Sequence, residues 1–305
     1  MLSLPLAAVD AQTLVDAVGL GAVYALMAVG IGLVFGVLRL VNFAYGQLVM
    51  AGAYTLAFTS GWPVAGSIIA CFAVVIALSF LMERAVFRPL RTASPAVMLV
   101  TTFAVAFLLQ SVALILDIRD GTIGEPAVTL APLNQAVSIG GVDVRKVTIL
   151  AVVVAAVTLA LLALLLGRTR IGLHMRAAST DFRTARLLGV RADTVIGVAV
   201  LLSGVLAAIV AMILTVQLPF VAPDFALKET IVVLVGVVVG GIDRLWTATL
   251  GGFAIGFASG VINGALPTDK TVFLPSALFA LVILVLLLRP AGVFARGRTA
   301  VVDRV

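Results

Sequence analysis

Long apolar runs, separated by short polar segments, make up most of the chain. A helix needs about 20 apolar residues to cross the hydrocarbon core of a bilayer, and nine runs are candidates. They cover residues 14–37, 43–60, 63–82, 96–116, 147–167, 194–216, 229–241, 247–265 and 274–288. The second run is rich in glycine and the seventh is short, so each could be re-entrant or broken. The pattern predicts an all-α integral membrane protein, a polytopic bundle of eight or nine transmembrane helices in a single domain over residues 1–305.

Composition agrees with this pattern and excludes several classes of protein. Of the 305 residues, 63% are hydrophobic and 11% are charged, and the mean hydropathy is +1.26. A soluble domain has roughly 25% charged residues, so a soluble enzyme, a disordered chain and a nucleic-acid-binding protein are excluded. Cys71 and His174 are the only residues of their types. We therefore expect no disulfide, no metal site and no cofactor.

The net charge of +6 becomes informative when it is divided between the two sides of a membrane. Loops rich in Lys and Arg stay in the cytoplasm. Nine alternating spans that begin outside place 15 of the 20 Lys and Arg residues in inner segments, and the opposite orientation would reverse this ratio. We therefore expect the N-terminus outside and the C-terminus in the cytoplasm.

Two connections between the runs are long. The outer one, 117–146, contains two prolines and a Gly-Gly pair, which predict turns and a short hairpin. The inner one, 168–193, carries six arginines and an amphipathic helix over 172–188 that ends at Gly189. The apolar positions that recur at spacings of three and four are Met175, Ala178, Phe182, Ala185 and Leu188. This periodicity suits a helix lying on anionic lipid headgroups and a docking element for a cytoplasmic partner equally well.

The centres of the apolar runs carry no ionisable side chain, because Glu83, Asp117 and Glu229 stand at run ends. Proton relays and ion-coupled carriers usually need buried ionisable groups, so the pattern argues against a proton-coupled carrier. The eighth run has glycine at every fourth residue, at Gly252, Gly256, Gly260 and Gly264. Such a face favours close packing against another helix. The alternative is a narrow translocation path lined by glycine backbone.

Uncharged polar residues are the better candidates for a translocation pathway, since a buried amide or hydroxyl is costly in hydrocarbon unless it has a partner. One group lies at the start of the second run: Asn42, Tyr45, Gly46 and Gln47. Another lies along the fourth run: Thr101, Thr102 and Gln110. Gln110 could instead form a hydrogen bond between helices. Free N–H groups at a helix start could bind a substrate carboxylate, which makes the first group the stronger candidate.

The sequence contains neither an ATP-binding motif nor a recognisable catalytic arrangement. No GxxxxGK[ST] motif occurs, so we do not expect the chain to bind ATP in the usual way. If ATP drives transport, the ATPase is another polypeptide. No Ser-His or paired-Asp arrangement within a run suggests an intramembrane enzyme.

Four segments carry a resemblance to a known family: VNFAYGQLVMAGAY (41–54), LVTTFAVAFLLQ (99–110), RAASTDFRTARLLGV (176–190) and LPSALFALVILVLLLRPAGVFARGR (274–298). In this order, over nearly the whole chain, they resemble the branched-chain amino-acid ABC transporter permeases of the LivH type. They correspond to the family's signature after its first helix, its Thr-containing fourth-helix segment, its cytoplasmic coupling segment and its C-terminal helix. Two departures are Tyr45, where the family often has His or Gln, and Asp243-Arg244, in a turn normally made of small residues.

The resemblance implies a permease subunit of an ABC importer in the bacterial inner membrane, for branched-chain or related small amino acids. Its partners would be a second related permease, two cytoplasmic ATP-binding subunits, an external substrate-binding protein and membrane lipid, with no nucleic acid. The residues implied in coupling to the ATPase are Arg176, Ala178, Phe182, Arg183, Arg186, Leu187 and Gly189. The alternative function is a self-contained secondary carrier or channel for a small polar solute such as urea or an amide.

Overall fold

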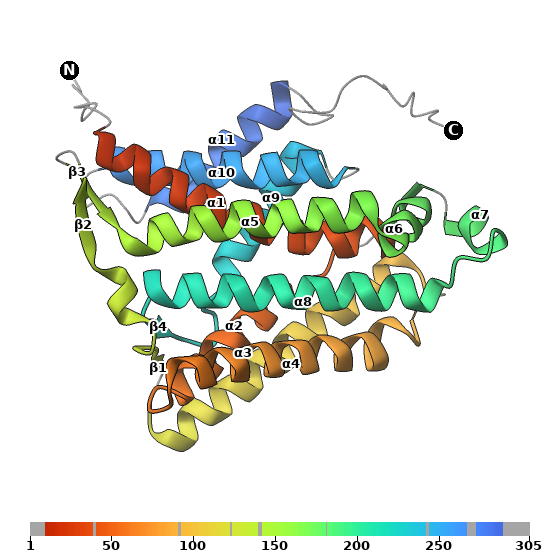
Figure 1. Ribbon diagram of the computed structural model, residues 1–305, viewed down its shortest axis with the longest axis horizontal. Helices are drawn as coiled ribbons and strands as arrows, with labels where there is room; N and C mark the ends of the chain where they lie inside the picture. The colour runs from red at the N-terminus through yellow and green to blue at the C-terminus, as the bar shows by residue number, and fades with distance from the viewer. Residues whose placement is uncertain are drawn as a thin grey trace.

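The computed structural model describes residues 10–38, 41–90, 93–122, 124–139, 142–180, 182–241, 244–266 and 273–288. These residues form a bundle of helices, with short strands at one end (Figure 1). The strands are β1 (Glu125–Pro126), β2 (Ala136–Ile139), β3 (Val142–Arg145) and β4 (Phe220–Val221). We call this end of the bundle the strand end. The opposite end contains α6 (Arg170–Thr180) and α7 (Phe182–Leu187), and we call it the basic end.

Helix α1 (Ala11–Leu38) is the central element of the bundle. Its most apolar window is 83% buried inside the chain, and it packs against α5 (Lys146–Arg168), α8 (Ala192–Gln217) and α10 (Leu245–Ala265). By contrast, α5 and α4 (Pro95–Asp120) are each 17% buried over their most apolar windows. Because their outward faces carry large exposed apolar side chains, these peripheral helices present a surface suited to lipid or to another membrane chain.

Six helices within the described residues are long and apolar enough to cross a membrane, fewer than the eight or nine expected. They are α1, α3 with its extension, α4, α5, α8 and α10. Helices α2 (Tyr45–Phe58) and α9 (Leu227–Gly240) have 14 residues each. At 1.5 Å per residue they are about 21 Å long, shorter than the roughly 30 Å hydrocarbon core. Helix α11 (Leu274–Leu288) has 15 residues. The second and seventh apolar runs are therefore short internal helices with non-helical chain beside them.

The four glycines of α10 lie against α1 between Thr13 and Ala28. A Cβ at Gly256 would come within 2.8 Å of the Gly21 Cα, and one at Gly260 within 2.5 Å of the Ala17 Cα. Gly252 faces Tyr24 and Ala28 of α1, and Gly264 faces Thr13. The glycine face thus brings two backbones into direct contact, and α1 occupies the space that a glycine-lined translocation path would need.

The strand end is organised by the connection between α4 and α5. Helix α4 ends at Asp120 and is capped by Gly121, which has a left-handed φ of 74°. Earlier in the chain, α3 (Val64–Met82) continues through a π-helical turn, η1 (Glu83–Phe87), before α4 begins. Strands β2 and β3 form the short hairpin expected in this loop, and β1 pairs with β4, which precedes α9. The η2 turn (Ala131–Asn134) lies between β1 and β2. Asp117 joins α2 to this region, because its Oδ2 accepts hydrogen bonds from the Tyr54 hydroxyl (2.8 Å) and the Gly124 N–H (2.9 Å).

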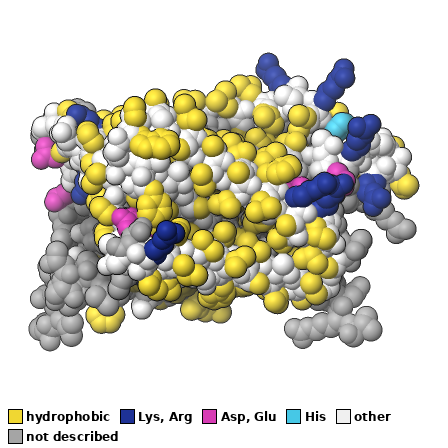
Figure 2. Space-filling model, turned by 90° about the horizontal axis from the view of Figure 1, so that it is seen from below, with side chains coloured by type: hydrophobic (Ala, Val, Ile, Leu, Met, Phe, Trp, Pro, Cys, Tyr) yellow, Lys and Arg dark blue, Asp and Glu magenta, His cyan; other side chains and the backbone are white. Residues whose placement is uncertain are grey.

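Basic side chains gather at the end opposite the strands, as Figure 2 shows, while apolar side chains cover the middle of the molecule. The exposed cations there include Arg168, Arg170, Arg176, Arg186 and Arg191. The single helix expected over 172–188 is divided into α6 and α7, and Asp181 between them lies outside the described residues. Gly189, with a φ of 89°, follows α7 as expected, and its N–H donates to the Arg186 carbonyl (3.1 Å).

Candidate functional site

Helix α2 starts inside the bundle rather than at its basic end. The ring of Tyr45, its first residue, packs against Gly30 of α1. Gly30 lies about 12 Å along α1 from the last residue, Leu38, at 1.5 Å per residue. Asn42 directs the chain into α2, because its Oδ1 accepts a hydrogen bond from the Ala44 N–H (3.1 Å). The start of α2 is therefore inside the protein, where its Tyr45, Gln47 and Leu48 N–H groups donate to the Asn42 and Ala44 carbonyls.

The start of α9 meets the start of α2. Gly46 lies against Thr230 and against the Ala226 carbonyl, and a Cβ at position 46 would overlap the Thr230 hydroxyl. That hydroxyl donates to the Ala226 carbonyl (2.6 Å). Glycine at 46 is therefore what allows the two helix starts to touch. Both starts carry the positive end of a helix dipole, so this junction attracts negative charge.

Glu229, in the first turn of α9, reaches the interior although it stands at the end of an apolar run. Its carboxylate lies within electrostatic range of the Tyr24 hydroxyl, which shares a hydrogen bond with Ser259. Tyr24 stands at the middle of α1. The Glu229 Oε2 atom is buried without a hydrogen-bond partner among the described residues. Glu229 does stand at the end of an apolar run, but that run begins inside the bundle because α9 is short.

Several polar atoms around the α2 start are also buried without a partner in the described part of the chain: Asn42 Nδ2, Tyr45 Oη and Gln47 Oε1. None of these three residues is more than 1% exposed. An unsatisfied buried polar group costs about 1–3 kcal/mol, so their retention in an apolar bundle indicates a role beyond packing. Together with Gly46, the structure brings all four residues of the first predicted group to one place, in a conformation closed to solvent.

The second predicted group lies apart from this place. Thr101 and Thr102 donate hydrogen bonds to carbonyls of their own helix, α4, at 2.8 and 2.9 Å. Gln110 is half-buried on the same peripheral helix. Helix α4 does approach the α2 start, because Phe103 stacks on Phe43 with ring centroids 4.0 Å apart. The interior site therefore consists of the α2 and α9 starts, with α4 alongside.

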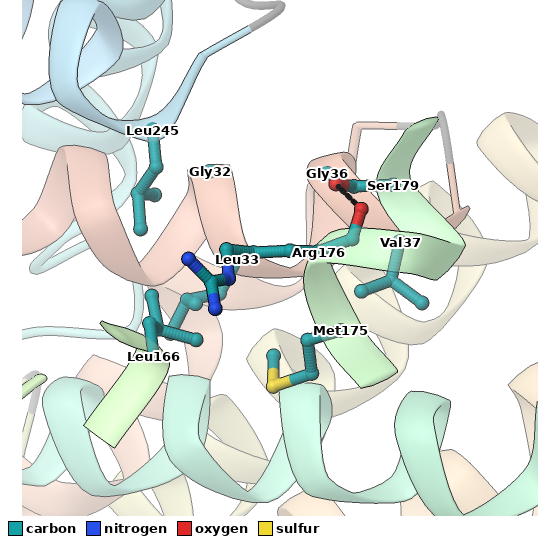
Figure 3. A pocket seen from close by; sticks show the side chains of 9 residues that line it. All are labelled: Gly32, Leu33, Gly36, Val37, Leu166, Met175, Arg176, Ser179 and Leu245. Atoms are coloured by element: carbon teal, nitrogen blue, oxygen red, sulfur yellow. Dashed lines mark hydrogen bonds between the residues drawn. The ribbon is translucent and has the colours of Figure 1, made fainter. Parts of the chain in front are cut away.

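At the basic end, a cavity of about 100 Å³ lies between α1, α5, α6 and α10 (Figure 3). Gly32 and Gly36 of α1 form one wall, and a Cβ at Gly36 would meet nothing within 4 Å. Met175 and Arg176 of α6 line the cavity, and the Arg176 guanidinium donates to the Gly167 carbonyl (3.5 Å). Helix α6 is therefore packed on the bundle with open space beside it.

The residues expected to couple to an ATPase divide into a buried and an exposed set. Ala178 is buried with Met175 on the inner face of α6, whereas Arg176 and Arg186 are exposed. Leu187 is 84% exposed. Leu188, expected on the buried face, is 80% exposed. The side chains of Phe182 and Arg183 lie outside the described residues, as does Asp243 of the altered turn.

Sequence reasoning missed Thr230, Tyr24 and Ser259 at the interior site. Each is a hydroxyl-bearing residue within an apolar run. Thr230 directly follows the charged pair Lys228-Glu229, which does not stand out because a membrane interface produces charges at the ends of apolar runs. Ser259 adjoins the glycine face of α10, next to Gly260.

Comparisons with known proteins agree with one another. Residues 13–289 match the family model described as the permease component of branched-chain amino acid transport systems. The high-affinity branched-chain amino acid transport permease BraD of Pseudomonas aeruginosa is 31% identical over 300 residues, covering 93% of this chain and 95% of the relative. LivH, the permease of the same description in Escherichia coli K12, is 28% identical over 302 residues, with the same coverage. LivH of Salmonella typhimurium is also 28% identical. No solved structure matches the chain.

Proposed function

The chain belongs to the family of branched-chain amino acid transport permease components, and we propose that it forms the translocation pathway of an ABC importer for branched-chain or related small amino acids. It is a multi-pass inner-membrane protein and a transport subunit rather than an enzyme. The observation that carries the proposal is the junction of the α2 and α9 starts. Buried polar atoms without partners gather there, inside a bundle with an apolar exterior.

We assign the basic end to the cytoplasm. Exposed arginines concentrate there, whereas the strand end carries fewer cations and several acids, including Asp143 and Asp224. Loops rich in Lys and Arg stay in the cytoplasm when a protein inserts into the membrane. In this orientation the N-terminus is outside, the C-terminus is cytoplasmic, the outer connection 117–146 faces a substrate-binding protein, and the inner connection 168–193 faces the ATPase.

The inner connection supplies the coupling element in this proposal. Helix α6 is anchored to the bundle by Met175 and Ala178, while α7 presents Arg186 and Leu187 to solvent. A soluble partner can cover exposed leucines flanked by arginines, whereas a monomer gains nothing from exposing them. Two ATP-binding subunits would dock here, one on this chain and one on a second related permease. We favour this docking role over the lipid-headgroup alternative because of the resemblance to the permease family.

The pathway itself runs through the α2 start. Asn42, Tyr45, Gly46 and Gln47 would contact the solute, and Thr101, Thr102 and Gln110 of α4 would lie along its route or against the second permease. ATP supplies the driving energy, so coupling needs no proton relay. Docking of the ATPase would move α6 relative to α1, and the cavity beside Gly36 leaves room for that movement.

Reconstitution tests the proposal. The chain would be purified with its native partners, identified by mass spectrometry, and placed in proteoliposomes with ATP inside and liganded binding protein outside. Leucine uptake should require ATP and every partner. The chain alone should not transport, and uptake by the chain alone would favour the self-contained carrier.

A pair of variants then tests the pathway. Asn42→Ala and Gln47→Ala should each lower uptake several-fold without affecting assembly of the complex. Thr215→Ala is the matched control, because its buried hydroxyl bonds to carbonyls of its own helix (2.9 Å). Wild-type uptake in both test variants would place the pathway elsewhere in the bundle.

A further inference from the structure

We propose that the Glu229 carboxylate binds the α-ammonium group of the transported amino acid, while the start of α2 binds its carboxylate. This inference rests on the proposed function, since it concerns the same site. It assigns a specificity-determining role to a residue outside the polar group predicted from the sequence. It also identifies the substrate class as zwitterionic, which separates amino acids from neutral solutes such as urea.

The α2 start offers hydrogen-bond donors. The amide of Asn42 is held in place there, because its Oδ1 accepts from the Ala44 N–H at 3.1 Å. Its Nδ2 atom, on the same amide, is buried and has no partner in the described part of the chain. The positive end of the dipole of this 14-residue helix lies at the same place, while its Tyr45, Gln47 and Leu48 N–H groups donate to backbone carbonyls. These groups together suit a carboxylate, and within the described residues no cation competes for it, because the nearby Lys228 is exposed to solvent.

The α9 start offers a negative charge instead. Glu229 offsets the positive end of its own helix, and its Oε2 atom remains buried without a hydrogen-bond partner among the described residues. Lys228 is within electrostatic range of this carboxylate but is itself exposed, and a buried carboxylate is costly unless a cation joins it. No group of three or more His, Cys, Asp or Glu suited to a metal ion occurs in the described part of the chain. An ammonium group on the substrate fits the carboxylate better than a metal ion does.

The two half-sites are joined by direct contact. Gly46 of α2 packs against Thr230 of α9, the residue that follows Glu229. Glu229 therefore lies one residue from this junction, with its carboxylate within electrostatic range of Tyr24 of α1. The opposite charges offered by the two helix starts match the two ends of an amino acid. Because the junction is closed, a substrate can occupy it only when α2 and α9 move apart. Binding of a zwitterion would replace the contact between the helices with contacts to both helix starts.

A structural explanation of Glu229 must be separated from this one. Glu at the third position of a helix often caps its own N-terminus, and Gln performs the same role. Glu229 accepts a hydrogen bond from its own backbone N–H, as such a residue does. Glu229→Gln therefore retains the capping group and removes the charge. Glu229→Asp retains the charge on a shorter side chain.

The experiment uses the complete reconstituted transporter with liganded binding protein, and compares leucine uptake with ATP hydrolysis. We expect Glu229→Gln to lower uptake about tenfold or more, with binding-protein-stimulated ATPase activity retained, so that fewer leucines enter per ATP. Glu229→Asp should transport better than Glu229→Gln. Asp224→Asn is the matched control, since it removes one exposed carboxylate five positions before Glu229 and should transport normally.

Three outcomes would overturn the inference. They are wild-type uptake by Glu229→Gln, equal losses in Glu229→Gln and Asp224→Asn, and better transport by the Gln variant than by the Asp variant. If Glu229→Gln fails to assemble, the comparison of Glu229→Asp with Asp224→Asn decides the question. The inference then requires measurable uptake by the Asp variant, and complete loss of uptake in an assembled Asp-variant complex contradicts it. A wild-type complex that accumulates no amino acid would instead refute the proposed function and the inference with it.

Discussion

Replacing Gly256 by Ala should separate the two most closely packed helices of the bundle. The new Cβ would lie 2.8 Å from the Gly21 Cα and 2.9 Å from both the Leu20 carbonyl oxygen and the Tyr24 Cβ. Ordinary carbon contacts are about 3.5–4.0 Å, so α1 and α10 must move apart by about 0.7–1.2 Å. Backbone atoms cannot yield as a flexible side chain can. A gap of about that size forfeits a quarter to a half of the dispersion attraction across the contact.

The same substitution at Gly197 of α8 is the control, because a Cβ there meets nothing within 4 Å. Both changes gain about 0.8–1.0 kcal/mol of helix propensity, so the difference between the variants isolates overpacking, about 1–3 kcal/mol. Thermal unfolding of the purified protein in detergent, followed by size-exclusion chromatography, should show Gly256→Ala melting several degrees below Gly197→Ala. Equal melting temperatures would refute the assigned contact between the α1 and α10 backbones.

Three further changes test other parts of the structure. Tyr54→Phe removes the 2.8 Å hydrogen bond to the buried Asp117 carboxylate, so it should cost about 1–3 kcal/mol in the same melting assay; an unchanged melting temperature would contradict the bond. Gly46→Ala would overlap the α9 start, so it should reduce leucine uptake at least several-fold in an assembled complex; normal uptake would argue against a tight junction. Arg186→Ala combined with Leu187→Ala alters exposed side chains of α7, so folding should persist while substrate-stimulated ATPase activity falls, and normal stimulation would argue against docking at α7.

The long helices could be predicted from hydropathy, because the length of an apolar run and its lack of polar residues together indicate a membrane-spanning helix. The run 14–37 corresponds to α1 and the run 194–216 to α8, within a few residues. The runs 43–60 and 229–241 are also apolar, yet each contains a short helix. Hydropathy measures how readily a segment leaves water, and a segment buried against protein meets the same condition as one buried in lipid. The glycine content of the second run and the shortness of the seventh indicate that each could be broken, but hydropathy alone cannot tell a full span from a short helix inside the bundle.

The candidate site could be predicted in part for the same reason. The polar group at the start of the second run, with Asn42 and Gln47, stands out because amides are rare in apolar runs. Glu229 does not stand out, since a charge at the end of a run is what a membrane interface produces. Its interior position follows from Thr230 packing on Gly46, a contact between residues far apart in the sequence. Local periodicity carries no information about such a contact.

The contrast between the two helix pairs indicates where the protein can move. Helices α1 and α10 touch backbone to backbone along the glycine face of α10, so sliding or separation would cost the contacts along that face. The α2 and α9 starts meet at one small residue, Gly46, beside buried polar atoms that lack partners. Opening that junction forfeits little packing and lets water or a solute satisfy the polar atoms. Closely packed elements tend to move as rigid bodies about such weak contacts. We therefore expect α1 and α10 to remain a fixed frame while α2 and α9 part to admit the substrate.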